Sequence, residues 1–532
     1  MKVLFLGIGS EQLGISQLAA IVKSKGHQVD LAFTASLFHD RFNLEIPWLH
    51  RFFDETDDVI QDIIQKDPDV IAFGALTATF QWCISVLRAV KKVKPNIKVI
   101  LGGVHVSAVP GVCLSYPEVN YAVVGEGENA IIDILNDIEQ GGLGQPINNT
   151  QYLNKDGQLI KGRQVGFHQD LDEFPFPEKT IWEPHVNLRD NYLILASRGC
   201  PYTCTFCFNN FFARLPEGKK GKYVRHRSVP HVIQELKWAK ARYKLKSVDF
   251  QDDVFTVDKE WLLEFCKVYK KEIDLPFNIL VHAKYFDEDI AQALSHAGCK
   301  WIQMGIQTMD EEYKTEILKR REKSDQIIVA LELMKKYKLR VKVDQMLALP
   351  GEPAGAQKLA LDLYKHYTPY RIQTFWTAFL PGTEMLFEAY KDGIVNDEEL
   401  RRLNHGEDFY FFRNQDNIKD PKLVRMYANY EFIYRILPSL PPFIRKRISE
   451  ESVDWIPRPI KNLLGKIIDV FQGLSTLNTE FTMYATFYLK NLLKFYLKKV
   501  GYKKYKIAKI YQDIPKPEFI PEKVESINPT EV

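Results

Sequence analysis

Three cysteines lie within eight positions of one another near the middle of the chain, at Cys200, Cys204 and Cys207. Three thiolates on one loop can bind three irons of a cubane iron–sulfur cluster and leave the fourth iron open for a substrate or a cofactor. A structural zinc site normally closes with four ligands, and the next histidine, His226, lies nineteen residues beyond Cys207. The spacing therefore favours an open [4Fe–4S] cluster over a zinc site or a chance grouping.

The cysteines follow the first of six apolar segments that alternate with helical segments. We expect strands at residues 192–197, 247–251, 278–283, 301–307, 340–347 and 372–379. This alternation indicates a parallel sheet. The range 190–385 is short for a closed eightfold barrel, which takes about 250 residues. The expected fold is therefore a partial (β/α)6 barrel, with the cysteines just after its first strand.

An earlier αβ alternation occupies residues 1–145. Apolar strands are expected at residues 2–7, 26–33, 69–74, 98–103 and 121–125, with helices at 13–25 and 81–93. Continuous apolar strands between helices indicate a doubly wound parallel sheet, whose ligands bind at the carboxyl ends of the strands. Glycines fall at three of these ends: Gly7-Ile-Gly9, Gly102-Gly103-Val-His105 and Gly125-Glu-Gly-Glu128. They are either tight turns or places where a ligand can approach the backbone.

Two further regions complete the expected domain organisation. Residues 146–189 form a linker with a small hairpin, which turns at Asn154-Lys-Asp-Gly157. Residues 386–532 are helical, aromatic and basic, and the stretch from Phe481 to Tyr511 holds eight lysines and no acidic residue. This stretch is either a solvated helix face or an amphipathic surface for anionic lipid, a long apolar substrate or nucleic acid.

Composition narrows the class of protein without naming a function. Apolar residues make up 45% of the 532 residues and charged residues 26%, which argues against a disordered chain or a disulfide scaffold. The net charge of +3 is too small to predict a nucleic-acid partner. The length of 532 residues exceeds one hydrophobic core, so we expect two or three domains. The first apolar run ends at Gly7 and is too short for an export signal, so we expect a cytoplasmic protein.

The spacing Cys200-x3-Cys204-x2-Cys207, with Phe206 before the last cysteine, resembles the signature of the radical S-adenosylmethionine (SAM) superfamily. The resemblance implies that the open iron chelates the amino and carboxylate groups of SAM. One-electron reduction then cleaves SAM to a 5′-deoxyadenosyl radical that abstracts hydrogen. The implied cofactors are a [4Fe–4S] cluster and SAM, and the implied partner is an external one-electron reductant.

The resemblance extends along the barrel and implies further SAM contacts. Asp252 and Asp253 follow the second strand, where relatives place a Gly-Gly-Glu that receives the methionine ammonium; capping of the next helix is the alternative. Lys284 and Gln307 lie at the ends of the third and fourth strands, where relatives often show an Arg and a Glu-Ser pair. Both depart from that pattern, although Lys can meet a carboxylate and Gln a ribose hydroxyl. Asp344 on the fifth strand is a candidate border of the adenine.

The N-terminal domain, placed before such a barrel, resembles the cobalamin-binding domain of the class B methylase group. The candidate cobalamin contacts are Thr77, Gly102, Gly103, His105, Gly125, Glu126 and Gly127. The Asp-x-His-x-x-Gly box, whose histidine ligates cobalt, is absent after the second strand. Either cobalamin binds without a protein histidine on cobalt, or the domain has lost the cofactor; we favour the first interpretation, without His105 as a cobalt ligand.

Two bound cofactors would predict methyl transfer to an unactivated carbon or phosphorus of a small-molecule or lipid-like substrate. The alternatives are a cobalamin-dependent radical oxidoreductase or cyclase, and, from another class, a non-catalytic iron–sulfur electron carrier or sensor. A methylthiotransferase would need three further N-terminal cysteines, and only Cys83 and Cys113 are present there. We expect no nucleic-acid partner, and we expect the basic C-terminal region to be the place of any peripheral membrane contact.

Overall fold

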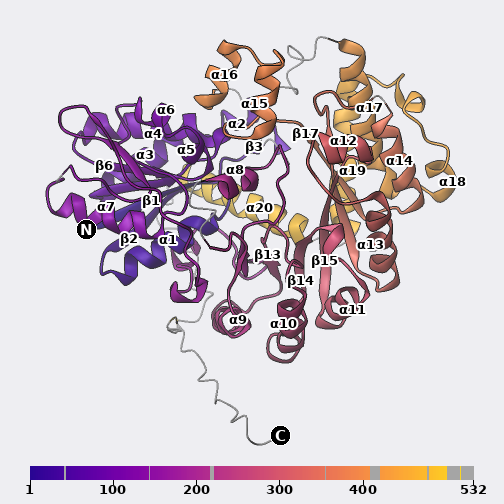
Figure 1. The fold of residues 1–532 in the computed structure, drawn as a ribbon, viewed down its shortest axis with the longest axis horizontal. Coiled ribbons are helices and arrows are strands. Elements are labelled where there is room, and N and C mark those ends of the chain that lie inside the picture. The colour runs from indigo at the N-terminus through magenta and orange to yellow at the C-terminus, as the bar shows by residue number, and fades with distance from the viewer. Residues whose placement is uncertain are drawn as a thin grey trace, which may run out of the picture.

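The computed structural model describes the chain except residues 41–43, 143, 216–220, 354, 408–419, 476–478, 500–515 and 517–532. Two main sheets lie beside each other, the N-terminal sheet on the left of Figure 1 and the barrel on the right, with the later helices mostly on the barrel side. Within the described part of the chain, no helix is long and apolar enough to cross a membrane.

The N-terminal sheet has the strand order β2-β1-β5-β6-β7-β8-β9, and its first five strands are parallel. The strands are β1 (Lys2–Ile8), β2 (Gln28–Thr34), β5 (Val70–Gly74), β6 (Lys98–Gly102), β7 (Tyr121–Val123), β8 (Thr150–Leu153) and β9 (Leu159–Lys161). The expected hairpin turn at residues 154–157 joins β8 to β9, and β8 pairs with β7 in antiparallel fashion. The linker hairpin therefore extends this sheet at one edge.

Helices cover both faces of the N-terminal sheet, as the continuous apolar strands predict. The helices are α1 (Leu13–Ser24), α3 (Thr56–Lys66), α4 (Thr77–Val93), α5 (Val104–Ala108), α6 (Pro110–Leu114) and α7 (Glu128–Glu139); β3 (His39–Asp40), β4 (Leu44–Glu45) and α2 (Pro47–His50) follow β2. Val3 and Phe5 pack in the core that includes α1 and α7, whereas Leu4 and Leu6 pack in the core that includes α3 and α4. This alternation along β1 confirms the doubly wound fold.

The barrel sheet has six parallel strands in the order β10-β13-β14-β15-β16-β17. They are β10 (Tyr192–Ile194), β13 (Val248–Phe250), β14 (Phe277–Val281), β15 (Cys299–Gln307), β16 (Arg340–Leu347) and β17 (Arg371–Trp376). The helices between them are α9 (Val229–Tyr243), α10 (Lys259–Glu272), α11 (Glu288–Ala297), α12 (Glu311–Glu316), α13 (Ser324–Lys336) and α14 (Ala356–His366). Strand order follows chain order, so the partial (β/α)6 barrel is confirmed.

Short-range signals in the sequence fix the ends of several barrel helices. Ser228, Asp258 and Asp287 precede α9, α10 and α11, and each side chain accepts a hydrogen bond from a backbone N–H of the first turn. Gly298 ends α11 in the left-handed conformation, with φ at +99°. These caps set where each βα loop begins and ends, and the candidate site lies in those loops.

The C-terminal region is helical, as its composition predicts. Its helices are α15 (Glu384–Lys391), α16 (Asp397–Asn404), α17 (Pro421–Ile436), α18 (Pro442–Arg445), α19 (Arg458–Ser475) and α20 (Thr479–Lys499). Helix α17 packs beside β17, where the Trp376 indole N–H donates to Glu431 (3.0 Å). Helix α20 reaches the N-terminal half at the centre of Figure 1, and its Tyr488 hydroxyl accepts from the Phe38 N–H (3.1 Å).

The linker joins the two halves through buried polar contacts. Lys179 is fully buried; it forms an ion pair with Glu11 of the β1–α1 loop and donates to the Leu193 carbonyl of β10 (2.8 Å). Trp182 is also fully buried, and its indole N–H donates to the Ser16 hydroxyl of α1 (2.9 Å). These contacts fix the carboxyl ends of the N-terminal strands relative to the first barrel strand.

Candidate active site

The cysteine loop leaves the barrel through a short antiparallel ribbon. Strand β11 (Ser197–Arg198) pairs with β12 (Arg225–His226), and α8 (Phe208–Arg214) begins directly after Cys207. Gly199 connects β11 to the first cysteine with φ at +90°, and a Cβ there would collide with the Tyr223 carbonyl. Only glycine fits this close approach of the two chain segments.

The middle of the cysteine loop is tied to distant parts of the chain. The Thr205 N–H and hydroxyl donate to the carbonyls of Leu318 (3.1 Å) and Ile317 (3.0 Å), which follow α12. The Thr205 carbonyl accepts from the N–H of Met385 in α15 (2.9 Å). These contacts anchor the loop at Thr205, directly after Cys204 and two residues before Cys207.

The three thiols are largely shielded from solvent and close enough to interact. Burial raises the pKa of Cys200 to about 12 and that of Cys207 to about 11, and it also raises the pKa of Cys204. Cys200 is affected by both other thiols, and Cys207 by Cys204. Thiolates at such a site need a compensating cation, which an iron–sulfur cluster supplies as it displaces the protons. The donor set therefore fits the cluster.

The thiols do not surround a single metal ion. Among the described residues, no three His, Cys, Asp or Glu side chains gather around one point at the distances that a mononuclear site requires. A cubane needs a different arrangement, because each thiolate binds its own iron.

A buried ionic network borders Cys204. The Arg320 guanidinium lies 4.0 Å from the Cys204 sulfur, pairs with Glu322 (2.5 Å) and donates to the Gly305 carbonyl (2.6 Å). Glu322 also contacts His282 (2.9 Å). Burial alone would raise the pKa of Glu322, but Arg320 and His282 lower it to about 2. Arg320 therefore keeps its charge beside the sulfur, where it can also meet an anionic ligand group.

Sequence reasoning missed this network. Arg320 and Glu322 stand in a run of charged residues between α12 and α13, which is indistinguishable from a solvated loop by composition. His282 belongs to a segment noted only for its Lys284 neighbour, and its ring stacks on Tyr202 of the cysteine loop with 3.8 Å between centroids. The one available signal in the sequence was the pair of opposite charges, Arg320 and Glu322, on either side of Arg321.

Asp252 supports the strand that leads into the cysteine loop. Its side chain is fully buried and accepts hydrogen bonds from the Ala196 N–H (3.1 Å) and the Ser197 hydroxyl. Burial raises the pKa of Asp252 to about 6. Helix capping, the alternative for this aspartate pair, is performed by Asp258, which accepts from the Trp261 N–H (3.1 Å).

Asp253 instead lies beside the thiols. Its charge contributes to the raised pKa of both Cys200 and Cys207, and its side chain keeps accessible surface. Desolvation by the surrounding protein raises the pKa of Asp253, and a hydrogen bond with Asn209 opposes that effect. Of the two aspartates, Asp253 is the one positioned to meet a ligand ammonium near the cluster.

The remaining candidate SAM contacts differ in placement. Gln307 has φ at +67° and folds over Gly305, where an added Cβ would lie 2.6 Å from the Gln307 amide nitrogen. Gln307 thus lies close to Arg320 at the end of β15. Lys284 has an exposed side chain on a single 3-10 turn, Ala283–Tyr285. Asp344 accepts from Gln303 of the neighbouring strand (2.7 Å).

A cavity of about 580 Å³ separates the N-terminal sheet from the cysteine loop. Its volume falls within the roughly 300–1,000 Å³ typical of ligand pockets. Five predicted cobalamin contacts line it: Gly102, Gly103, Gly125, Glu126 and Gly127. The opposite wall includes Arg198 and Gly199 of the cysteine loop, while α1 and the linker add apolar side chains. The cavity therefore connects the strand ends of the first domain with the cluster loop of the second.

Gly103 shapes the wall of this cavity. Its φ is +92°, and a Cβ would lie 2.8 Å from the Ala75 carbonyl oxygen. The β5 and β6 turns can approach each other only because no side chain stands between them. Backbone thus borders the cavity here.

Thr77 and His105 lie behind the wall and do not line the cavity. The His105 ring is fully buried, with its Nδ1 3.1 Å from the Thr77 hydroxyl and its centroid 4.6 Å from that of Phe80. Burial lowers the pKa of His105 to about 4. His105 is therefore a neutral core residue, and its expected contact with the corrin remains a prediction.

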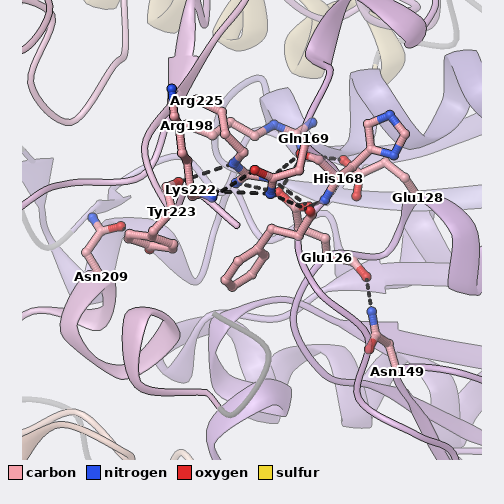
Figure 2. A network of polar contacts seen from close by, with 11 residues as sticks. Glu126, Glu128, Asn149, His168, Gln169, Arg198, Asn209, Lys222, Tyr223 and Arg225 are labelled. Atoms are coloured by element: carbon pink, nitrogen blue, oxygen red, sulfur yellow. Dashed lines mark hydrogen bonds and ion pairs between the residues drawn. The ribbon is translucent and has the colours of Figure 1, made fainter. Parts of the chain in front are cut away.

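The two halves meet beside the cavity in a cluster of four charged side chains, shown in Figure 2. The Glu126 carboxylate accepts from Arg198 (3.1 Å), from Arg225 (2.9 and 3.1 Å) and from the His168 N–H (3.0 Å). Glu128 forms a second ion pair with Arg198 (2.7 Å). Arg198 belongs to β11 and Arg225 to β12. The glycine-rich turn of the first domain that carries Glu126 and Glu128 therefore forms ion pairs with both strands of the ribbon that leads to the cysteine loop. We call these four residues the interdomain clamp.

A ligand cavity at the strand ends of a doubly wound domain, facing a three-cysteine loop on a partial barrel, defines a class of enzymes that bring two cofactors together. The Radical SAM superfamily matches residues 194–363, and the B12 binding domain matches residues 9–135. The chain therefore carries a B12 binding domain followed by a radical SAM domain, the combination that the sequence predicts. Its cofactors are a [4Fe–4S] cluster, SAM and cobalamin, as the sequence predicts.

Alignments with several named proteins cover most of the chain. An uncharacterized methyltransferase of Pyrococcus horikoshii is 25% identical over 84% of this chain and 96% of its own length. A cytidylyl-2-hydroxyethylphosphonate methyltransferase of Streptomyces wedmorensis is 21% identical, covering 74% of this chain and 80% of the relative. An anaerobic magnesium-protoporphyrin IX monomethyl ester cyclase of Rubrivivax gelatinosus is also 21% identical, with 69% and 64% covered.

Solved structures show the same fold. The cobalamin-dependent SAM radical enzyme OxsB, solved with aqua-cobalamin and SAM, has a TM-score of 0.62 and 16% identity. The match covers 94% of this chain and 80% of that one, so it extends over both sheets and the later helices. The expectation that the chain is a radical SAM enzyme is confirmed.

Proposed function

We propose that this enzyme transfers a methyl group to an unactivated carbon or phosphorus of a small-molecule or lipid-like substrate. The supporting observation is the cavity that reaches from Gly103 to Gly199, the residue before the first cysteine. A cobalamin in this cavity would lie next to the cluster loop, so a substrate held between them could meet both cofactors. Two of the three relatives described above are named methyltransferases.

The chain's own residues would bind and orient the cofactors and shield them from water. When bound, the cluster and SAM supply hydrogen abstraction and cobalamin supplies the methyl donor. The three cysteines would hold the cluster, Asp253 would receive the methionine ammonium, and Arg320 would meet a carboxylate beside Cys204. The apolar cavity wall excludes water, which protects reactive species from side reactions. An external one-electron reductant completes the requirements.

A radical cyclisation or oxidation is the second candidate, supported by the relative named as a cyclase. An electron carrier or sensor is disfavoured, because a carrier has no need of acidic and polar side chains around an open iron. Such a reading also leaves the interdomain cavity without a purpose.

Product analysis tests the proposal directly. Anaerobically reconstituted enzyme is incubated with a strong reductant, cobalamin and SAM carrying a trideuterated methyl group, in the presence of a total lipid and metabolite extract. Methyl transfer predicts 5′-deoxyadenosine, S-adenosylhomocysteine and a product that carries the label. Formation of 5′-deoxyadenosine without S-adenosylhomocysteine or label would contradict methyl transfer and favour cyclisation or oxidation.

A matched pair of variants assigns the aspartates in the same assay. Asp253→Asn should raise the KM for SAM at least tenfold, because the amide no longer attracts the ammonium. Glu264→Gln, an exposed carboxyl change on α10, serves as the control and should leave the KM unchanged. An unchanged KM in Asp253→Asn would remove this residue from the SAM site.

A further inference from the structure

Helix α19 packs against the protein with its polar side. Gln472 is buried and donates to the Arg435 carbonyl (2.8 Å) and the Ser439 hydroxyl (2.9 Å). Lys461 is buried with its ammonium on Asn429. Asp469 faces Arg435 at 3.9 Å. These three side chains, of the kind that usually marks the solvent side of a surface helix, are therefore turned inward.

The opposite side of α19 is apolar and exposed. Seven large side chains follow the helical spacing, with exposed fractions of 39–63%: Ile460, Leu463, Leu464, Ile467, Val470, Phe471 and Leu474. Trp455, just before the helix, is 78% exposed. A continuous stripe of this size on a protein surface marks a binding face, because single exposed apolar residues are ordinary but aligned ones are not. We call these seven residues the α19 stripe.

Charge around the stripe is positive. Residues 458–499 hold seven basic and two acidic residues; Lys461 and Asp469 are turned inward, which leaves six basic residues and one acidic residue. Helix α20, which packs on α19, exposes Leu489, Leu493 and Tyr496. The surface thus combines apolar side chains with a net positive surround.

We propose that the α19 stripe docks on the surface of a bilayer that contains anionic lipids. An amphipathic helix with apolar side chains outward and basic residues around it lies in the headgroup region of such a bilayer. A second copy of this chain fits less well, since a twofold contact through the stripe would bring like charges together. Docking of this kind does not depend on which reaction the barrel catalyses.

Vesicle binding tests the assignment with the full-length holoenzyme. Sedimentation is measured with vesicles of equal parts phosphatidylglycerol and phosphatidylcholine, and with phosphatidylcholine alone. Wild type should bind the anionic vesicles, and Leu463→Glu/Ile467→Glu/Phe471→Glu should weaken binding by roughly 100-fold, because three apolar groups no longer enter the lipid. All three residues are exposed, so the variant should fold.

A matched control places the same chemistry elsewhere on the surface. Val329→Glu/Leu359→Glu/Phe387→Glu changes three exposed apolar residues of α13, α14 and α15, with exposed fractions of 49%, 51% and 63%. This control should bind anionic vesicles like wild type. Circular dichroism and bound iron confirm that each variant is folded.

Three outcomes would overturn the proposal. Wild type could fail to bind anionic vesicles at low ionic strength, or the control could lose binding as strongly as the stripe variant. The stripe variant could instead abolish a concentration-dependent dimer seen by sedimentation velocity, with vesicle binding absent throughout. That last result would assign the stripe to contact between copies of the chain.

Discussion

The interdomain clamp offers the sharpest test of how the two halves are held together. In Glu126→Gln the side chain keeps its size but loses its charge, and Arg225, whose side chain is 4% exposed, is left without a carboxylate. Uncompensated buried charge of this kind costs about 3 kcal/mol. Glu128→Gln is the matched control, since Arg198 still contacts Glu126; its cost should be about 1 kcal/mol.

Hydrogen exchange reads this difference locally. Peptides that contain the ribbon of β11 and β12 should exchange roughly 100-fold faster in Glu126→Gln and about fivefold faster in Glu128→Gln, while peptides from α11 remain unchanged. Both variants are measured at pH 7, because the arginines lower the pKa of Glu126 against the effect of burial and keep it ionised. Equal protection of the ribbon in wild type and Glu126→Gln would refute the clamp as a structural link between the cavity and the cysteine loop.

Three further perturbations test other parts of the structure. Lys179→Met leaves the buried Glu11 carboxylate without its ion-pair partner and should lower the free energy of unfolding by about 3–5 kcal/mol. The double variant Lys179→Met/Glu11→Leu should recover most of this loss. A double variant as unstable as the single variant in thermal unfolding would contradict this prediction. Burial lowers the pKa of His105 to about 4, so as pH falls from about 6.5 to about 4 the unfolded chain binds a proton on this histidine before the folded chain does. Over that pH range the free energy of unfolding of the wild type should fall by up to about 3 kcal/mol relative to that of His105→Gln. Parallel curves of stability against pH for the two proteins would contradict this prediction. Gly103→Ala should weaken cobalamin binding, measured by absorbance titration, and should lower the free energy of unfolding by more than about 1 kcal/mol because of the positive φ at this position. A variant that binds cobalamin with wild-type affinity would show that the cavity wall tolerates a side chain here.

Periodicity and spacing were sufficient for the fold. Continuous apolar strands such as residues 2–7 predict burial on both faces, and six of them after residue 190 predict the partial barrel, because these signals are local. The linker hairpin shows the limit of local signals: its turn at Asn154–Gly157 was evident, but its pairing with β7 depends on which sheet edge lies nearby.

The site divides in the same way. Cysteine spacing identifies the cluster loop, and glycines at strand ends identify the wall of the cavity. Asp252 and Asp253 could not be told apart, because adjacent residues on a loop face different sides and only the contacts with Ala196 and the thiols distinguish them. Arg320 reaches Cys204 across more than a hundred residues of sequence. Such pairings are tertiary, and no single-sequence pattern carries them.

The central claim is that Cys200, Cys204 and Cys207 hold an open cubane. Anaerobic reconstitution followed by iron and sulfide analysis and electron paramagnetic resonance of the reduced protein tests it most directly. We predict about four irons per chain in wild type, with a signal that shifts when SAM is added, and neither feature in the triple Cys→Ala variant. A wild type without cluster signal, or a folded triple variant that retains it, would contradict the account.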